Sequence, residues 1–149
     1  MKIDMLYDAS FFTPVLVLIL WTLLMWVWMY ATRIPAMQKA KIDPQDAISP
    51  ASGNWRSKIP DEVHWKADNY NHLHEQPTIF YALMFFTGLT AGSGDTFLLV
   101  LAWAYVILRI AHSIVQVTIN KVMIRFILFA LSSLVLIVFA LKEAVRIFF

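Results

Sequence analysis

Cysteine is absent from this chain of 149 residues. The chain can therefore form no disulfide, and it offers neither a thiolate ligand for a metal nor a thiol nucleophile. Any sulfur chemistry must be supplied by a bound ligand.

Charged residues are also scarce. They make up 15% of the chain, whereas an ordinary soluble domain contains about 25%. The formal net charge is only +2, and the basic residues of the polar loop are matched by acids in the same loop. Because a nucleic-acid-binding surface needs concentrated positive charge, we expect no nucleic-acid partner.

Hydrophobic residues are abundant instead, at 60%, and they are gathered into long runs with the charges between them. A helix of roughly 20 apolar residues crosses the hydrocarbon core of a bilayer. The sequence therefore predicts an integral membrane protein with a single all-α domain, 1–149, folded as a four-transmembrane-helix bundle in contact with membrane lipids. The expected spans are 11–32, 63–90, 95–118 and 122–145.

The second span is the least apolar of the four. Its apolar run, 77–90, is too short to cross a bilayer, so we expect its helix to begin near Asp61 or Val63 with polar first turns. Residues 33–62 before it carry mixed charge and several prolines, which predicts a polar loop. A short turn over 91–95 follows the span.

The distribution of lysine and arginine predicts the orientation. Basic residues favour the cytoplasmic side of a membrane, which places the 33–62 loop in the cytoplasm and both termini outside. The residues on the basic side are Arg33, Lys39, Lys41, Arg56, Lys58, Lys66, Lys121 and Arg125, against Lys2, Lys142 and Arg146 on the other.

A polar stripe runs along the third span. Arg109 lies near its middle, where a charge facing lipid costs at least about 2.5–3.5 kcal/mol, so this side chain must face protein or water. His112, Gln116 and Asn120 follow at i+3, i+7 and i+11, on the same helical face.

The second span carries a matching stripe of Asp68, His72 and Glu75 at i, i+4 and i+7, in which Glu75 is the expected partner of Arg109. Two interpretations remain open. Glu75 and Arg109 form a structural ion pair that fixes helix register, or the stripe is a functional site, as intramembrane ionisable residues commonly are.

Metal binding is not expected. His72, Glu75 and His112 would supply only three converging ligands because His74 points away, and no two-histidine zinc pattern is present. Ser113 adjoins His112, but neighbouring side chains diverge on a helix, so the pair predicts no nucleophile.

Arg125 lies at the start of the fourth span, within reach of the same membrane-edge cavity. Arg125 is therefore either a residue of that cavity or only a snorkelling anchor at the cytoplasmic surface. The same alternative applies more strongly to Lys121.

Several short motifs follow one another in order across the spans. They are Lys39-Ala40 and Pro44-Gln45-Asp46-Ala47, then His72-Leu73-His74-Glu75 with Pro77 and Phe80-Tyr81, then Arg109-Ile110-Ala111-His112 and Arg125. In this combination the chain resembles the membrane-associated proteins in eicosanoid and glutathione metabolism (MAPEG), the superfamily of microsomal glutathione transferases, leukotriene synthase and prostaglandin E synthase. The stretch 75–81 is similar to bacterial members, which implies a bacterial inner membrane.

The resemblance implies four-helix protomers assembled as a homotrimer, with glutathione bound at the cytoplasmic side between subunits. Arg125 resembles the catalytic arginine that stabilises the glutathione thiolate, and Glu75 the acid that meets the glutathione amino group. Arg109 and His112 resemble third-helix site residues. The resemblance also implies that Asn71, His72 and Gln116 occupy further glutathione-binding positions.

Four positions depart from the family pattern. Asp68, Asn71 and His72 stand where family enzymes carry arginines and an asparagine, and Gln116 replaces a tyrosine. The missing arginines would pair with the glutathione carboxylates, whereas Asp68 would repel them.

Three functions remain open. The first is a glutathione-dependent transferase or peroxidase that acts on lipophilic electrophiles. The second is a non-catalytic or differently liganded membrane protein that binds another small molecule or lipid in the polar cavity between the helices. A transporter has less support, because the sequence shows neither an internal repeat nor a broken apolar helix.

Overall fold

The computed structural model describes residues 9–47, 55–90 and 92–149. Lys2, residues 48–54 of the expected polar loop and Ala91 of the expected turn lie outside these ranges. Within them the chain is helical, with no strand. The α-helices are α1 (Thr13–Lys39), α2 (Asp61–His72), α3 (Gln76–Leu89), α4 (Thr96–Thr118) and α5 (Val122–Phe148), and the 3-10 helices are η2 (Ala9–Phe12), η3 (Pro44–Ala47) and η5 (Trp55–Lys58).

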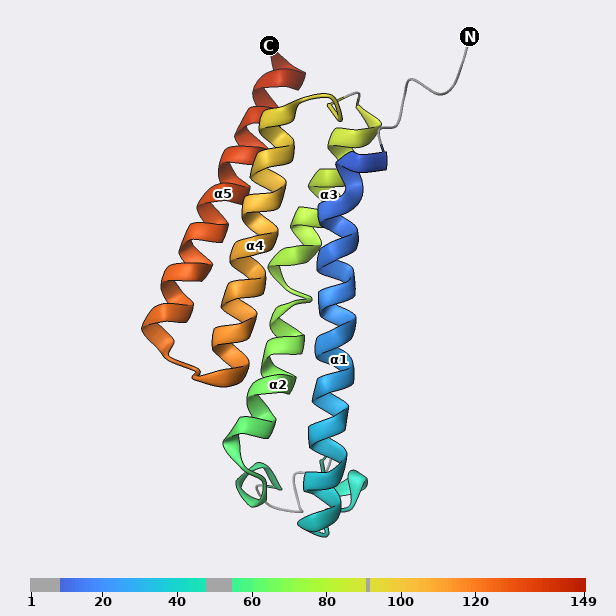
Figure 1. Cartoon of the computed structure of the whole chain (residues 1–149), viewed down its shortest axis with the longest axis vertical. Coiled ribbons are helices and arrows are strands. Elements are labelled where there is room, and N and C mark those ends of the chain that lie inside the picture. Colours follow the sequence, from blue (N-terminus) through green and yellow to red (C-terminus); the bar gives the residue numbers. More distant parts are fainter. Residues whose placement is uncertain (1–8, 48–54, 91) are drawn as a thin grey trace.

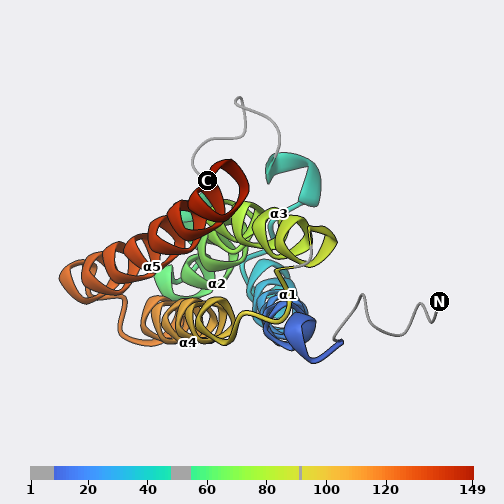
Figure 2. The same ribbon diagram turned by 90° about the horizontal axis from the view of Figure 1, so that it is seen from above.

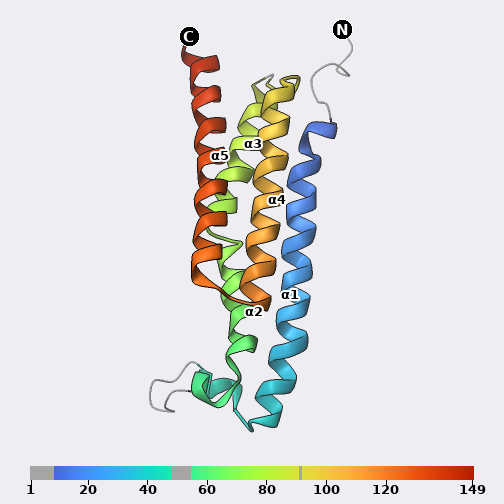
Figure 3. The ribbon, with the colours of Figure 1, turned by 60° about the vertical axis from the view of Figure 1, so that its left-hand side comes forward.

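The helices run side by side as an elongated bundle (Figure 1). Seen along the bundle, α4 lies between α1 and α5, and it also packs against α2 (Figure 2). Both α1 and α2 extend beyond the α4–α5 turn, towards the end that carries η3 and η5 (Figures 1 and 3). These two 3-10 helices therefore lie at the opposite end of the bundle from the start of α1 and the end of α5.

Three helical segments in the described part of the chain are long and apolar enough to cross a membrane: Ser10–Lys39, Thr96–Thr118 and Val122–Phe148. The fourth column of the bundle is formed by α2 and α3, which follow one another along the same direction (Figure 1). With 14 residues, α3 is about 21 Å long at 1.5 Å per residue. It is therefore too short to cross a bilayer of about 30 Å by itself.

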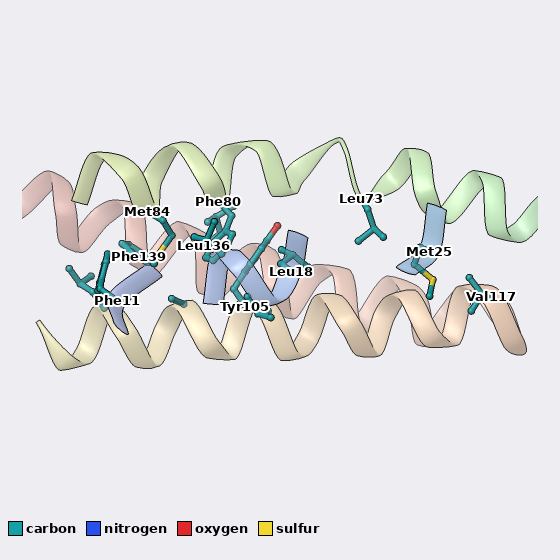
Figure 4. Packing of buried hydrophobic residues seen from close by; sticks show 14 residues of the cluster. Phe11, Leu18, Met25, Leu73, Phe80, Met84, Tyr105, Val117, Leu136 and Phe139 are labelled. Carbon is teal, nitrogen blue, oxygen red and sulfur yellow. The ribbon is translucent and has the colours of Figure 1, made fainter. Parts of the chain in front are cut away.

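The break between α2 and α3 differs from the expectation of one continuous helix. Pro77 lies in the first turn of α3, where its missing N–H costs no helical hydrogen bond. In a continuous helix its ring would clash with the carbonyl of Leu73, so the chain turns at 73–75 instead. Figure 4 shows the interruption, with Leu73 directed into the bundle. A broken span also occurs in transporters, but no internal repeat accompanies it in this sequence.

The first helix is longer than expected, because α1 continues to Lys39 through Pro35. The first part of the expected 33–62 loop is therefore helical. The extra turns carry α1 beyond the turn between α4 and α5, so they project from the bundle at its polar end.

The apolar core lies between α1, α3, α4 and α5 (Figure 4). Phe80 of α3 stacks on Tyr105 of α4, with 4.6 Å between ring centroids. Gly88 of α3 allows close approach of the Phe12 ring, because a Cβ at this position would collide with that ring. Much of the remaining apolar surface, particularly on α5, is exposed, as expected for a helix in contact with lipid.

Candidate functional site

Arg109 is fully buried in the protomer, which confirms that its charge faces protein. Its Nη2 donates to the carbonyl of His72, the last residue of α2, at 3.0 Å. A cation at this position also complements the negative end of the helix dipole. Within the described residues, Nε and Nη1 of Arg109 have no hydrogen-bond partner. The buried guanidinium thus keeps two donors without a partner, and neither is exposed at the protomer surface.

Glu75 does not form the expected ion pair with Arg109 in the part of the chain that the structure covers. Its Oε2 lies 2.6 Å from Nδ1 of His72 instead. The break after α2 brings these two side chains together, and the Glu75 side chain remains 65% exposed. His72 therefore links the two polar stripes, through its ring to Glu75 and through its carbonyl to Arg109.

A cavity of about 240 Å³ lies beside this linkage, between α2, α4 and α5. Its lining residues are His72, His112, Val122, Arg125, Phe126 and Phe129. The rings of His72 and His112 are 5.0 Å apart between centroids. His112 is buried, and neither of its ring nitrogens bonds to another described residue. The cavity therefore combines basic and imidazole groups with an aromatic and aliphatic wall.

Arg125 is fixed by the turn between α4 and α5. Its Nη1 donates to Oδ1 of Asn120 at 2.7 Å, and Asn120 adopts a positive φ of 47°, which asparagine tolerates better than most residues. The Arg125 Nε has no partner among the residues described. The guanidinium is therefore held at the cavity with a donor unused.

A second hollow, of about 400 Å³, lies at the polar end of α2. Its lining residues are Arg56, Ser57, Asp61, His64, Trp65, Asp68 and Asn120. Nη2 of Arg56 lies 3.3 Å from both carboxylate oxygens of Asp68. Asn120 lines this hollow and also accepts the hydrogen bond from Arg125, so it lies between the two cavities.

The structure brings some of the predicted site residues together and separates others. His72, His112 and Arg125 line one cavity, with the Arg109 guanidinium 5.7 Å from the centroid of its Phe129 wall. Gln116 is buried but is not part of the lining, and Asn71 is exposed. Among the described residues, no three His, Asp or Glu side chains are grouped as metal ligands.

Sequence reasoning missed the apolar wall and a polar contact. Phe129 and its neighbours on α5 look like any lipid-facing residues in the sequence. Ser113 accepts hydrogen bonds from Asn69 Nδ2 at 2.8 Å and from Trp21 Nε1 at 3.0 Å. The serine therefore joins three helices, a role that the local pattern did not signal.

The comparison with protein families gives one assignment. A sequence model of the MAPEG family matches residues 11–145, from the start of the first span almost to the end of the last. No curated protein and no solved structure gives a significant match. Because the family match covers nearly the whole helical bundle and includes every residue of the cavity, this membrane protein belongs to the MAPEG family.

Proposed function

We propose that the protein is a glutathione-dependent transferase or peroxidase that acts on lipophilic electrophiles. The observation that carries the proposal is the cavity between α2, α4 and α5, where Arg125, His112 and His72 face an apolar wall. Such a site suits a polar nucleophile that meets a lipophilic partner.

The chemistry of the cavity fits the sulfur of glutathione. A guanidinium favours the anionic form of a neighbouring thiol, and the thiolate is the nucleophilic form. Arg125 lines the cavity, and the buried Arg109 adds a second positive charge on the far side of the Phe129 wall. Arg125 is therefore our candidate catalytic residue.

The lipophilic partner would enter from the bilayer. Val122 and Phe126 line the cavity on α5 and are 76% and 64% exposed in the protomer. This apolar side offers a path that does not cross water. A lipid hydroperoxide or another hydrophobic electrophile fits such an approach.

The glutathione carboxylates need cationic partners, and Asp68 occupies one position where family enzymes carry arginine. In this structure the Arg56 guanidinium lies 3.3 Å from the Asp68 carboxylate. Arg56 of η5 therefore places a guanidinium close to the position where family enzymes carry an arginine. Asn120 lines the same hollow and accepts a hydrogen bond from Arg125 of the cavity. Arg56 is thus the cation that a glutathione carboxylate would pair with in that hollow, in competition with Asp68.

We further propose that the site is completed in a homotrimer, with the polar connection in the cytoplasm of a bacterial inner membrane. Glu75 and Asn71 are exposed on the protomer, at the break where a neighbouring subunit would cover them. Glu75 would then meet the glutathione amino group, close to Asn71.

A different ligand is the second candidate. Asn71 offers no charge where a glutathione carboxylate would be held, and Asp68 is already paired with Arg56. These two observations favour a member of the family that holds another small molecule or an anionic lipid against Arg125. A titration with glutathione distinguishes the two candidates.

The decisive experiment is isothermal titration of glutathione into the purified protein in detergent, alongside Glu75→Gln and Arg125→Ala. We expect binding in the micromolar to millimolar range that weakens in both variants. Consumption of glutathione with a generic aromatic electrophile should be lost in Arg125→Ala.

Lys121→Ala is the matched control. Lys121 is an exposed cation four positions before Arg125, outside the cavity lining, so its removal should leave binding and turnover unchanged. Full turnover in Arg125→Ala would remove the proposed role of this arginine. If glutathione gives no heat of binding with the unaltered protein, the proposed glutathione-dependent activity is ruled out and the differently liganded protein becomes the favoured function.

A further inference from the structure

The pair formed by His72 and Glu75 has a geometry suited to proton transfer. The Oε2 of Glu75 lies 2.6 Å from Nδ1 of His72, and His72 lines the cavity that also contains Arg125. The same residue thus contacts a carboxylate and lines the candidate reaction space.

The contact with Glu75 determines which ring nitrogen is free. An ionised carboxylate only accepts hydrogen bonds, so Nδ1 of His72 carries the proton and donates it to Glu75. Nε2 then holds a lone pair, and it makes no hydrogen bond within the described part of the chain. The atom that His72 can offer to a ligand is therefore a proton acceptor.

The other histidines nearby lack this combination. His112 shares the cavity, but no carboxylate contacts its ring. His74 is exposed, and its Nδ1 lies 2.8 Å from the Tyr70 carbonyl, away from the cavity lining. Of the three, His72 alone combines an orienting carboxylate with the cavity.

We propose that His72 is a general base of this site, oriented by Glu75, and that it removes the proton of the nucleophile while Arg125 stabilises the resulting anion. The inference rests on the proposed function and deepens it. It assigns proton transfer to a dyad that straddles the break between α2 and α3. Glu75 acts as a positioning residue in this step, and its charge stabilises the imidazolium that forms.

The step balances without an external oxidant. Nε2 of His72 accepts the thiol proton, the S–H bond breaks and a thiolate remains beside Arg125. The thiolate then forms a C–S bond with an electrophilic carbon of the lipophilic substrate. For an epoxide, the C–O bond breaks, and the imidazolium returns the proton to the oxyanion, which regenerates neutral His72.

A purely structural role for the pair makes a different prediction. His72 and Glu75 flank the turn between two helices, so their contact also stabilises this turn. Loss of that contact would lower stability and glutathione binding alike. Loss of a base would spare binding and reduce thiolate formation and turnover.

The test compares His72→Asn with His74→Asn, a neighbouring histidine outside the cavity. Glutathione binding is measured by calorimetry, thiolate formation by its ultraviolet absorbance on mixing, and turnover by kcat/KM with an epoxide. We expect His72→Asn to retain binding, to lose the thiolate signal and to lose about 100-fold or more in kcat/KM, the lower range for general base catalysis. His74→Asn should behave like the unaltered protein.

Rescue by imidazole separates chemistry from folding. The variant His72→Ala leaves space at the cavity, and free imidazole should restore part of its thiolate signal and turnover. Normal thiolate formation in His72→Asn would overturn the proposal. So would a folded His72→Ala variant whose lost thiolate absorbance is not restored by imidazole. Failure of the unaltered protein to bind glutathione would instead remove the proposed function and, with it, this inference.

Discussion

Ser113 accepts hydrogen bonds from Trp21 of α1 and Asn69 of α2 while it is itself part of α4. Its hydroxyl is fully buried, as is Asn69. In a bilayer no water can replace a lost partner, so a single small side chain fixes how three helices meet beside the candidate site.

We expect Ser113→Ala to lower the free energy of unfolding by about 1–2 kcal/mol, because it leaves two donors without an acceptor. The midpoint of SDS-induced unfolding measures this change. Ser132→Ala is the control, since the buried Ser132 hydroxyl donates only to the carbonyl of Phe129 in its own helix. Equal effects in the two variants would contradict the bridging role.

At the scale of the elements, the C-terminal ends of α2 and α3 each receive hydrogen bonds from an arginine of another helix. Arg109 of α4 donates to the carbonyl of His72 at the end of α2. Arg146 of α5 donates to the carbonyl and hydroxyl of Thr90, just after α3, at 2.7 and 2.6 Å. Carbonyls at the end of a helix lack internal partners. Arg109 therefore supplies a tertiary partner at the break, and Arg146 supplies one at the opposite end of α3.

Arg146 also pairs with Glu143, whose carboxylate is only 2% exposed and accepts from Nε and Nη2 at 3.0 and 2.6 Å. We expect Arg146→Met to cost about 3 kcal/mol or more, because it leaves a buried carboxylate without a cation. The double variant Glu143→Leu with Arg146→Met should recover part of this loss. A double variant less stable than the single one, measured in the same unfolding assay, would contradict this account.

At the scale of the whole molecule, the two ends of the bundle differ in chemistry. The end with η3 and η5 carries the second hollow and the Arg56–Asp68 pair. The other end carries the Glu143–Arg146 pair and the contact of Lys142 with Asp95, at 3.5 Å. The cavity with Arg125 opens near the first of these ends, beside the turn between α4 and α5. In the orientation that we propose, a water-soluble thiol would reach it from the cytoplasm.

The orientation can be tested cleanly because the chain has no cysteine. Lys58→Cys places a single thiol in η5, and Gly94→Cys places one in the turn between α3 and α4, where nothing lies within 4 Å of an added Cβ. In intact cells we expect a membrane-impermeant maleimide to label Gly94→Cys, and to label Lys58→Cys only after permeabilisation. The reverse pattern would invert the proposed topology.

The sequence by itself determined the membrane class and most of the helical architecture. The apolar runs of α1, α4 and α5 exceed the length needed to cross a bilayer, which leaves few alternatives to a helix. The burial of Arg109 followed from the cost of exposing a charge to lipid. Such constraints act on each segment alone, so they can be read without knowledge of its neighbours.

Only the tertiary structure decided how the polar residues pair. The stripes predicted that Glu75 would meet Arg109, but the turn that Pro77 imposes directs Glu75 to His72 and leaves the His72 carbonyl to Arg109. The composition of the cavity likewise depends on how α5 is rotated against α2 and α4. Rotation and axial offset between helices arise from side-chain packing across the bundle, and the periodicity of one helix does not encode them.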